Sequence, residues 1–249
     1  MLFDKNHLIF LGVSFAIIIA TLIICYKFVK QEKHKNLILK IASILTVAIH
    51  FSSLYVDYFT TGKAEVESVM LIPIYPCNIV MWLLLILAFM KNKQGKAFKG
   101  LAVFSFYLGM TGGLVGLLCN EIYASDPNMA DWGVLKGLVS HVVLIFNSLY
   151  LLVGGYIKIR VKNVISVAIG LCGMIVEGGI VIGLYKLCNL DPPNSMYLLE
   201  SPFASAPWIN PYLIGVVALV LVFVIGSIVE QIALKKEDRW YKKIKEKKQ

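Results

Sequence analysis

Two residues in separate apolar segments have the types needed for nucleophilic catalysis, a cysteine and a histidine. Cys77 directly follows Pro76, in a segment that also contains Pro73, and His141 lies in a later apolar segment. Proline is favoured in the first turn of a helix and disrupts a helix elsewhere. We therefore expect a regular helix to begin near Pro76 and to place Cys77 in its first turn. The positive end of the helix dipole stabilises a thiolate there, and a histidine within reach would act as its base.

Other ionisable side chains also interrupt apolar segments. His50 and Glu177 lie far from any loop, and His50 shares one helix face with Ser53 and Asp57. An ionisable residue inside a membrane costs about 2.5–3.5 kcal/mol on insertion scales, so each one invites a functional hypothesis. The alternative for each is structural: a histidine can bond a neighbouring helix, and Glu177 can be a protonated acid or part of a proton relay.

The elements that must position these residues are transmembrane helices. The chain has 249 residues, of which 58% are hydrophobic and 16% charged, whereas a soluble domain is ~45–50% apolar and ~25% charged. This composition excludes a soluble enzyme, a disordered chain and a disulfide-rich secreted scaffold. It predicts an all-α polytopic bundle in residues 1–234, followed by a basic cytoplasmic tail in residues 235–249. The seven predicted spans are Leu8–Phe28, Leu37–Phe59, Leu71–Met90, Leu101–Tyr123, Lys136–Ile157, Val164–Leu187 and Tyr212–Leu234.

The basic residues predict the orientation of the spans. The net charge is +9, and 20 of the 24 Lys and Arg residues fall in the first, third and fifth connections and in the tail. The positive-inside rule then places the N-terminus outside and the C-terminus in the cytoplasm. The tail is better explained as a topogenic and lipid-headgroup segment than as a nucleic-acid-binding arm. With this orientation Cys77, His141, His50 and Glu177 fall in the outer half of the membrane, where we expect one shared polar pocket. Glu230, near the inner end of the last span, is expected to reach toward Lys235.

Small residues and cysteines give weaker signals. Small-xxx-small pairs, which indicate close helix packing, occur at Gly109/Gly113 and Gly112/Gly116 in the fourth span and at Gly179/Gly183 in the sixth. The five cysteines have no metal-ligand spacing, so no metal site is predicted. Cys119 and Cys188 lie near the outer ends of their helices, where a disulfide is geometrically feasible.

Three segments resemble the YwaF family, a group of bacterial integral membrane proteins whose animal relative is transmembrane protein 164. They are the Pro73–Asn78 segment, His141 in the fifth span, and the outer loop that contains Asn194-Ser195-Met196-Tyr197-Leu198 and Pro207-Trp208. The similarity covers most of the chain, and the loop motif is its most specific part. Bacterial members tend to have a histidine at the position of Tyr75, which retains a hydrogen-bonding group.

The resemblance implies a cysteine-dependent lipid acyltransferase, the activity in which the animal relative is implicated. Cys77 would be the nucleophile and His141 the base, with Asn78 or Asn147 donating to the oxyanion and Tyr197 and Trp208 holding lipid headgroups. The loop residue Asn194 and the side chains of His50, Tyr75 and Glu177 would support the site. The expected partners are membrane lipids, with no cofactor and no nucleic acid, in a cell membrane and specifically a bacterial plasma membrane.

Two other functions fit the same residues. In a membrane transporter or ligand-binding protein, His50, Glu177 and His141 would line a polar or proton route, and Cys77 would be dispensable. A purely structural membrane subunit is the third alternative.

Overall fold

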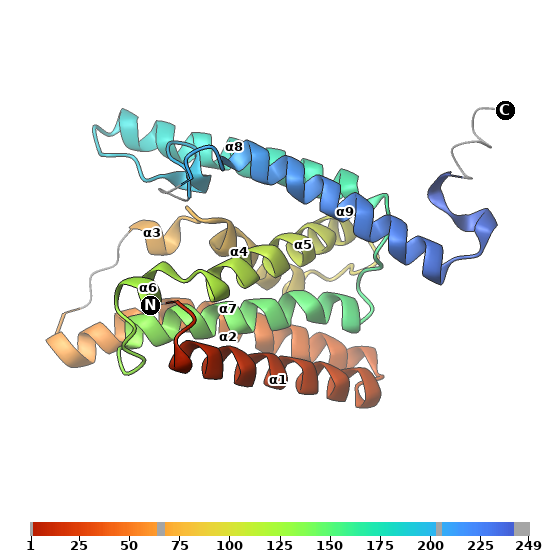
Figure 1. Cartoon of the computed structure of the whole chain (residues 1–249), viewed down its shortest axis with the longest axis horizontal. Coiled ribbons are helices and arrows are strands. Elements are labelled where there is room, and N and C mark those ends of the chain that lie inside the picture. The colour runs from red at the N-terminus through yellow and green to blue at the C-terminus, as the bar shows by residue number, and fades with distance from the viewer. Residues whose placement is uncertain (1, 64–67, 203–205, 242–249) are drawn as a thin grey trace. The chain divides into compact units, whose positions relative to one another are not determined.

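The computed structural model describes residues 2–63, 68–202 and 206–241, and the described residues are helical with no strand (Figure 1). The chain divides into two compact units. The first comprises Met1–Gln94 and Ser105–Tyr156, and the second comprises Gly95–Phe104 and Ile157–Gln249. The helices are α1 (Lys5–Phe28), α2 (Glu32–Thr61), α3 (Ser68–Leu71), α4 (Pro76–Phe89), α5 (Lys96–Leu118), α6 (Glu121–Ser125), α7 (Trp132–Val153), α8 (Asn163–Leu187) and α9 (Pro211–Ala233), with 3-10 turns η1 (Ser195–Tyr197) and η2 (Lys236–Asp238).

The helices confirm the predicted helical membrane bundle. In the described residues six apolar helical stretches are long enough to cross a membrane, namely α1, α2, α5 continued by α6, α7, α8 and α9. The third predicted span, Leu71–Met90, contains a shorter helix, because α4 has only 14 residues. At 1.5 Å per residue α4 covers about 21 Å, less than the ~30 Å of a bilayer core.

The short helix α4 begins where the prolines require it to begin. Pro76 occupies the first turn, and Tyr75 is the N-cap in an extended conformation. The Tyr75 carbonyl accepts hydrogen bonds from the N–H groups of Asn78 and Ile79, at 3.0 and 3.2 Å. Residues 72–75 form no helix and separate α4 from α3. The prediction that Cys77 lies in the first turn of a helix is therefore confirmed.

Helix α7 lies at the centre of the first unit. It packs against α1, α2, α4 and α6, and α2 also packs against α4; Figure 1 shows α1, α2 and α7 side by side. A buried polar chain ties three of these helices together. Asn147 Nδ2 on α7 donates to Ser43 Oγ on α2 at 3.0 Å, and that hydroxyl donates to the Leu84 carbonyl on α4 at 3.1 Å.

One glycine face brings α5 against α7. Gly116 lies against the His141 ring, and Gly109 and Gly113 lie in the same way against the side chains of Ser148 and Ile145 on α7. Gly112 has no atom within 4 Å of the position where a Cβ would stand. The close approach predicted for this span is real, but it uses the face formed by Gly109, Gly113 and Gly116.

Hydrogen bonds connect the start of α1 to the end of α5 and to α6. Asp4 caps α1 by accepting the His7 N–H at 2.9 Å, and it also accepts the Tyr123 hydroxyl at 2.7 Å. These two hydrogen bonds lower the pKa of the Asp4 carboxyl from its usual value. The fully buried His7 ring shares a 3.0 Å hydrogen bond with the Leu117 carbonyl.

In the second unit α8 packs against α9 and against η1. The contact with η1 is made at Gly178, where an added Cβ would lie 2.8 Å from Leu198 and 3.1 Å from Met196. The pair predicted to mediate packing, Gly179 and Gly183, has no atom of a described residue within 4 Å of an added Cβ, so the packing is made at Gly178 instead of at this pair. The segment around η1 packs at Gly178, and Phe104 of α5 packs at Gly170 of the same helix.

Glu230 on α9 does not reach toward Lys235 as predicted. Its carboxylate is buried and accepts the backbone N–H groups of Val161 and Trp240, at 2.9 and 3.1 Å. A buried carboxylate needs hydrogen-bond donors. The sequence pattern did not reveal that a loop and the chain after α9 would supply them.

Candidate functional site

A small polar pocket lies among α2, α4 and α7 in the first unit. Its volume is about 40 Å³, which is room for only a few water molecules. The lining residues are Thr46, His50, Cys77, Asn78, Met81, Ser140, His141 and Leu144. Cys77 and His141, which were predicted from separate segments of the sequence, therefore line the same pocket.

The Cys77 thiol is partly buried at the N-terminal end of α4. It donates to Asn78 Oδ1 at a sulfur–oxygen distance of 3.5 Å. The Asn78 and Ile79 N–H groups are both bonded to the Tyr75 carbonyl, but no backbone carbonyl of the described residues accepts the Cys77 N–H. Unpaired N–H groups of a first helical turn attract negative charge. This end of the pocket is suited to an anionic atom.

The His141 imidazole enters the pocket from α7, with one edge against Gly116 on α5. A Cβ at position 116 would overlap three atoms of the ring, so only glycine leaves room for this orientation. The ring makes no hydrogen bond with any residue in the described part of the chain. Its nitrogens are thus available to a thiol or a substrate, unlike those of a structural histidine held by a carbonyl.

His50 also lines the pocket, but its Nε2 is engaged in a 3.0 Å hydrogen bond with the Met70 carbonyl. This bond ties α2 to the segment that ends just before the α3–α4 break. His50 therefore bonds a neighbouring segment, which is the structural alternative considered for it, and its ring also lines the pocket.

Two of the predicted supporting residues lie in the first unit but do not line the pocket. Asn147 is fully buried in the bonded chain with Ser43, and its Oδ1 has no partner among the described residues. Tyr75 is 41% exposed and acts through its carbonyl as the N-cap of α4. Of the two amides considered as oxyanion donors, Asn78 alone reaches the pocket.

The other predicted residues belong to the second unit. Glu177 on α8 has a buried Oε2 atom with no partner among the described residues. Asn194 organises its own loop: its Oδ1 accepts the N–H groups of Leu199 and Glu200, and its Nδ2 donates to the Glu200 carbonyl. Tyr197 has a φ of 58°, and Trp208 is 68% exposed. The amide of Asn194 thus holds its own loop together and is not a free ligand group.

Sequence reasoning missed Thr46, Ser140 and Gly116. The Thr46 hydroxyl donates to the Ala42 carbonyl at 2.8 Å, and Ser140 donates to Gly137 at 2.9 Å. Thr46 lies one turn before His50 on the same helix face, a spacing that could have identified it. Nothing in the sequence pairs Gly116 with His141, because that contact joins two different helices.

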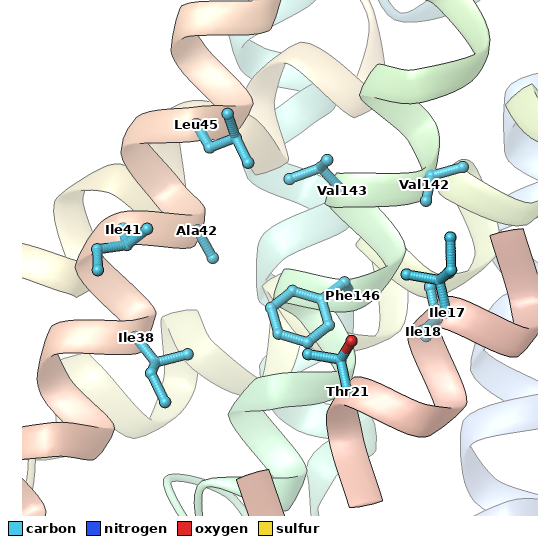
Figure 2. Close-up of a pocket in the computed structure, with 10 residues that line it drawn as sticks. All are labelled: Ile17, Ile18, Thr21, Ile38, Ile41, Ala42, Leu45, Val142, Val143 and Phe146. Carbon is cyan, nitrogen blue, oxygen red and sulfur yellow. The ribbon is translucent and has the colours of Figure 1, made fainter. Parts of the chain in front are cut away.

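A larger cavity of about 260 Å³ lies between α1 and α2, with α7 as its floor (Figure 2). Its walls are apolar, and the Thr21 hydroxyl is the polar group seen among the side chains in Figure 2. The α7 residues here, Val142, Val143 and Phe146, occupy the opposite face of that helix from Ser140, His141 and Leu144. This cavity offers no group for catalysis and is separate from the polar pocket.

Metal and disulfide chemistry have no support in the described residues. No group of three or more His, Cys, Asp or Glu residues lies close enough to hold a metal ion in this part of the structure. All five cysteines have free thiols, so Cys119 and Cys188 are not joined.

Comparison with known proteins identifies one relative group. The sequence model of the TMEM164 family matches residues 2–229, nearly the whole chain. Neither the curated proteins nor the solved structures gave a match.

Proposed function

Because the chain, an integral membrane protein, belongs to the TMEM164 family, we propose that it is a lipid acyltransferase that uses Cys77 as nucleophile and His141 as base. The supporting observation is that these two side chains, from α4 and α7, line the same small pocket. Acyl transfer through a cysteine requires a thiol, a neighbouring base and donors for an oxyanion. The pocket lining contains one candidate of each kind: the Cys77 thiol, the His141 imidazole and the Asn78 amide.

In the first half-reaction an ester carbonyl of a lipid enters the pocket. His141 takes the proton of the Cys77 thiol, and the sulfur forms a bond to the carbonyl carbon. The tetrahedral intermediate then collapses, and its C–O bond to the lipid breaks. The departing oxygen takes the proton from the imidazolium, which leaves a lysolipid and an acyl thioester on Cys77.

In the second half-reaction the roles of the groups are reversed. The hydroxyl of an acceptor lipid gives its proton to His141 and forms a C–O bond to the thioester carbonyl. The C–S bond breaks, and the thiolate takes the proton back from the imidazolium. The enzyme is restored, and one acyl group has moved from donor to acceptor.

Two candidate donors would stabilise the oxyanion in both steps. No backbone carbonyl of the described residues accepts the Cys77 N–H, and the Asn78 side chain accepts the thiol, which leaves its amide NH₂ group beside the sulfur. Because the burial of Cys77 removes the water that would stabilise a thiolate, proton transfer to His141 is needed for attack. The small pocket volume means that the ester group alone enters, while the chains of the lipid stay outside.

We propose that the reaction takes place in the outer half of a bacterial plasma membrane, with the N-terminus outside. The distribution of basic residues supports the orientation, and the position of Cys77 near the start of α4 then supports the outer half. The bacterial plasma membrane rests on the family resemblance. A transporter remains the alternative, in which the hydrogen-bond-free imidazole of His141 would bind a solute or a proton rather than act on Cys77.

The test is acyl exchange by the purified protein in lipid nanodiscs that contain a phospholipid and an isotopically labelled lysophospholipid. Mass spectrometry should show labelled diacyl lipid for the parent protein and for Cys119→Ala, whose thiol is exposed elsewhere. Cys77→Ala and His141→Ala should form none. The proposal would be contradicted if exchange persisted in Cys77→Ala. It would also be contradicted if the parent showed no exchange with any phospholipid class tried.

A further inference from the structure

One buried carboxylate joins two basic segments at the same end of the second unit. Glu230 is 5% exposed, and one oxygen accepts the Val161 N–H while the other accepts the Trp240 N–H. Val161 lies in the loop before α8, and Trp240 follows η2. These two backbone positions are 79 residues apart in sequence, and the Glu230 carboxylate bonds both of them.

Further contacts hold the two segments in place. Gly226, one turn before Glu230, lies against the loop, since a Cβ there would meet Val161 N at 2.8 Å. The Trp240 ring packs edge-on against Phe223 with 5.4 Å between ring centroids. The Arg239 guanidinium donates to the Gln231 carbonyl at 2.8 Å, near the end of α9. The chain after α9 is thus folded onto the helix and the loop.

The joined segments carry cations that no contact with a described residue neutralises. Four basic side chains form no hydrogen bond or ion pair with any described residue: Lys158, Arg160, Lys162 and Lys235. Glu237 and Asp238 in η2 are the acidic residues of the tail segment. In sequence, residues 157–163 and 230–241 contain six basic and three acidic residues. One of the acidic residues, Glu230, already accepts two backbone N–H groups.

The position of this cluster points to its partner. Helix α8 begins at Asn163 and α9 ends at Ala233, so the cluster lies where both apolar helices reach the membrane boundary. Lipid phosphates lie at this level, and Trp and Tyr side chains such as Trp240 and Tyr241 favour it. We propose that loop 158–162 and segment 235–241, joined by Glu230, form a binding site for the phosphate of an anionic phospholipid headgroup.

The proposed site, made of loop 158–162 and segment 235–241 together, can be distinguished by experiment from general attraction of basic loops to a negatively charged membrane surface. General attraction depends on how many cations lie near the membrane, about 1 kcal/mol for each. In the composite site the preference also depends on Glu230, a negative charge, because this residue holds the two halves together. Loss of a negative charge that weakens binding of an anionic lipid would be opposite to the general effect.

The experiment uses Trp240 as a local reporter in the full chain, with Trp82, Trp132 and Trp208 replaced by Phe. Fluorescence quenching is compared in nanodiscs that contain equal mole fractions of brominated phosphatidylglycerol or brominated phosphatidylcholine. We expect stronger quenching by the anionic lipid in the parent. Arg160→Gln/Lys162→Gln should lower the preference for phosphatidylglycerol over phosphatidylcholine by about fivefold for each cation removed. Glu230→Gln should abolish this preference.

Two matched controls isolate the site. Lys33→Gln/Lys91→Gln removes the same charge from the first unit, at the start of α2 and after α4, and should leave the ratio unchanged. Gly226→Ala, which pushes the loop away, should lower the ratio, whereas Gly215→Ala, whose nearest neighbour is at 3.8 Å, should not. Equal quenching by both lipids in the parent, or an equal loss in Lys33→Gln/Lys91→Gln, would overturn the proposal. Native mass spectrometry of the chain with all four Trp residues, which should retain phosphatidylglycerol over phosphatidylcholine, gives the same decision if the Trp variant does not fold.

Discussion

The imidazole of His141 lies directly against the backbone of Gly116, at the place where any other residue would have its Cβ atom. This contact fixes the side of α7 from which the ring enters the pocket that it shares with Cys77. The orientation of the proposed base is therefore set by a residue on another helix, α5, that has no side chain of its own.

Gly116→Ala should displace the imidazole and slow acyl transfer. A misplacement of about 1 Å can cost roughly 100-fold in rate, and alanine favours helix formation over glycine, so α5 itself should persist. The measurement is the rate of labelled lipid formation, with circular dichroism to confirm the helix content. Gly112→Ala is the control on the same helix, because nothing lies within 4 Å of its added methyl group. Equal rates in the two variants would show that Gly116 does not position His141.

The two asparagines considered from the sequence should separate into a catalytic and a structural residue. Asn78→Ala removes the acceptor of the thiol and an oxyanion donor, so the rate should fall by about 10²–10³ while the thermal midpoint changes little. Asn147→Ala breaks the bonded chain between α7 and α2 and should lower the free energy of unfolding by about 1–3 kcal/mol. Kinetics and thermal unfolding in detergent check both. The opposite pattern would assign the oxyanion role to Asn147.

Sequence patterns predicted those parts of the protein that depend on neighbours along the chain. The start of α4 at Pro76 follows from the restricted backbone of proline, and the helical spans follow from the length of apolar segments. Contacts between helices were harder to predict. The glycine pairs indicated close packing of α5, but predicting that Gly109, Gly113 and Gly116 contact α7 while Gly112 does not requires knowing where α7 lies.

The same limit explains the errors at charged residues. Lys235 is close to Glu230 in sequence and was an obvious partner, whereas Val161 lies 69 residues away. Backbone N–H groups carry no signature in the sequence, so a carboxylate that binds them cannot be distinguished in advance from one that reaches a lysine. His50 was likewise assigned to the pocket correctly, but its bond to the Met70 carbonyl could not be foreseen.

The hydrogen bonds that Asp4 accepts at the start of α1 should stabilise the protein less in acid. Hydrogen bonds from the His7 N–H and the Tyr123 hydroxyl lower the pKa of this carboxyl. A carboxyl whose pKa is lower in the folded protein adds stability that is present above its unfolded pKa, about 3.9, and is lost as the pH falls through the folded value. The parent should therefore melt at a higher temperature than Asp4→Asn near neutral pH, and this difference should shrink below about pH 4. A difference that stays constant with pH would contradict this role for Asp4.

The predicted orientation can be tested independently of catalysis. A fluorescent reporter that folds only in the cytoplasm should be active when fused after Gln249, and a periplasmic phosphatase fused there should be inactive, because the basic loops stay in the cytoplasm. The reverse pattern would place the C-terminus outside and move the pocket to the inner half of the membrane.

The most direct test of the account is to find the acyl group on the protein during turnover. The parent protein is incubated in nanodiscs with a phospholipid whose acyl chain carries an alkyne, without acceptor, and its peptides are analysed by mass spectrometry. The account predicts an acyl thioester on Cys77, removed by hydroxylamine, absent from Cys77→Ala and formed far more slowly by His141→Ala. If the acyl group is found on another cysteine, or if lipid is exchanged without any adduct on Cys77, the proposed nucleophile is wrong.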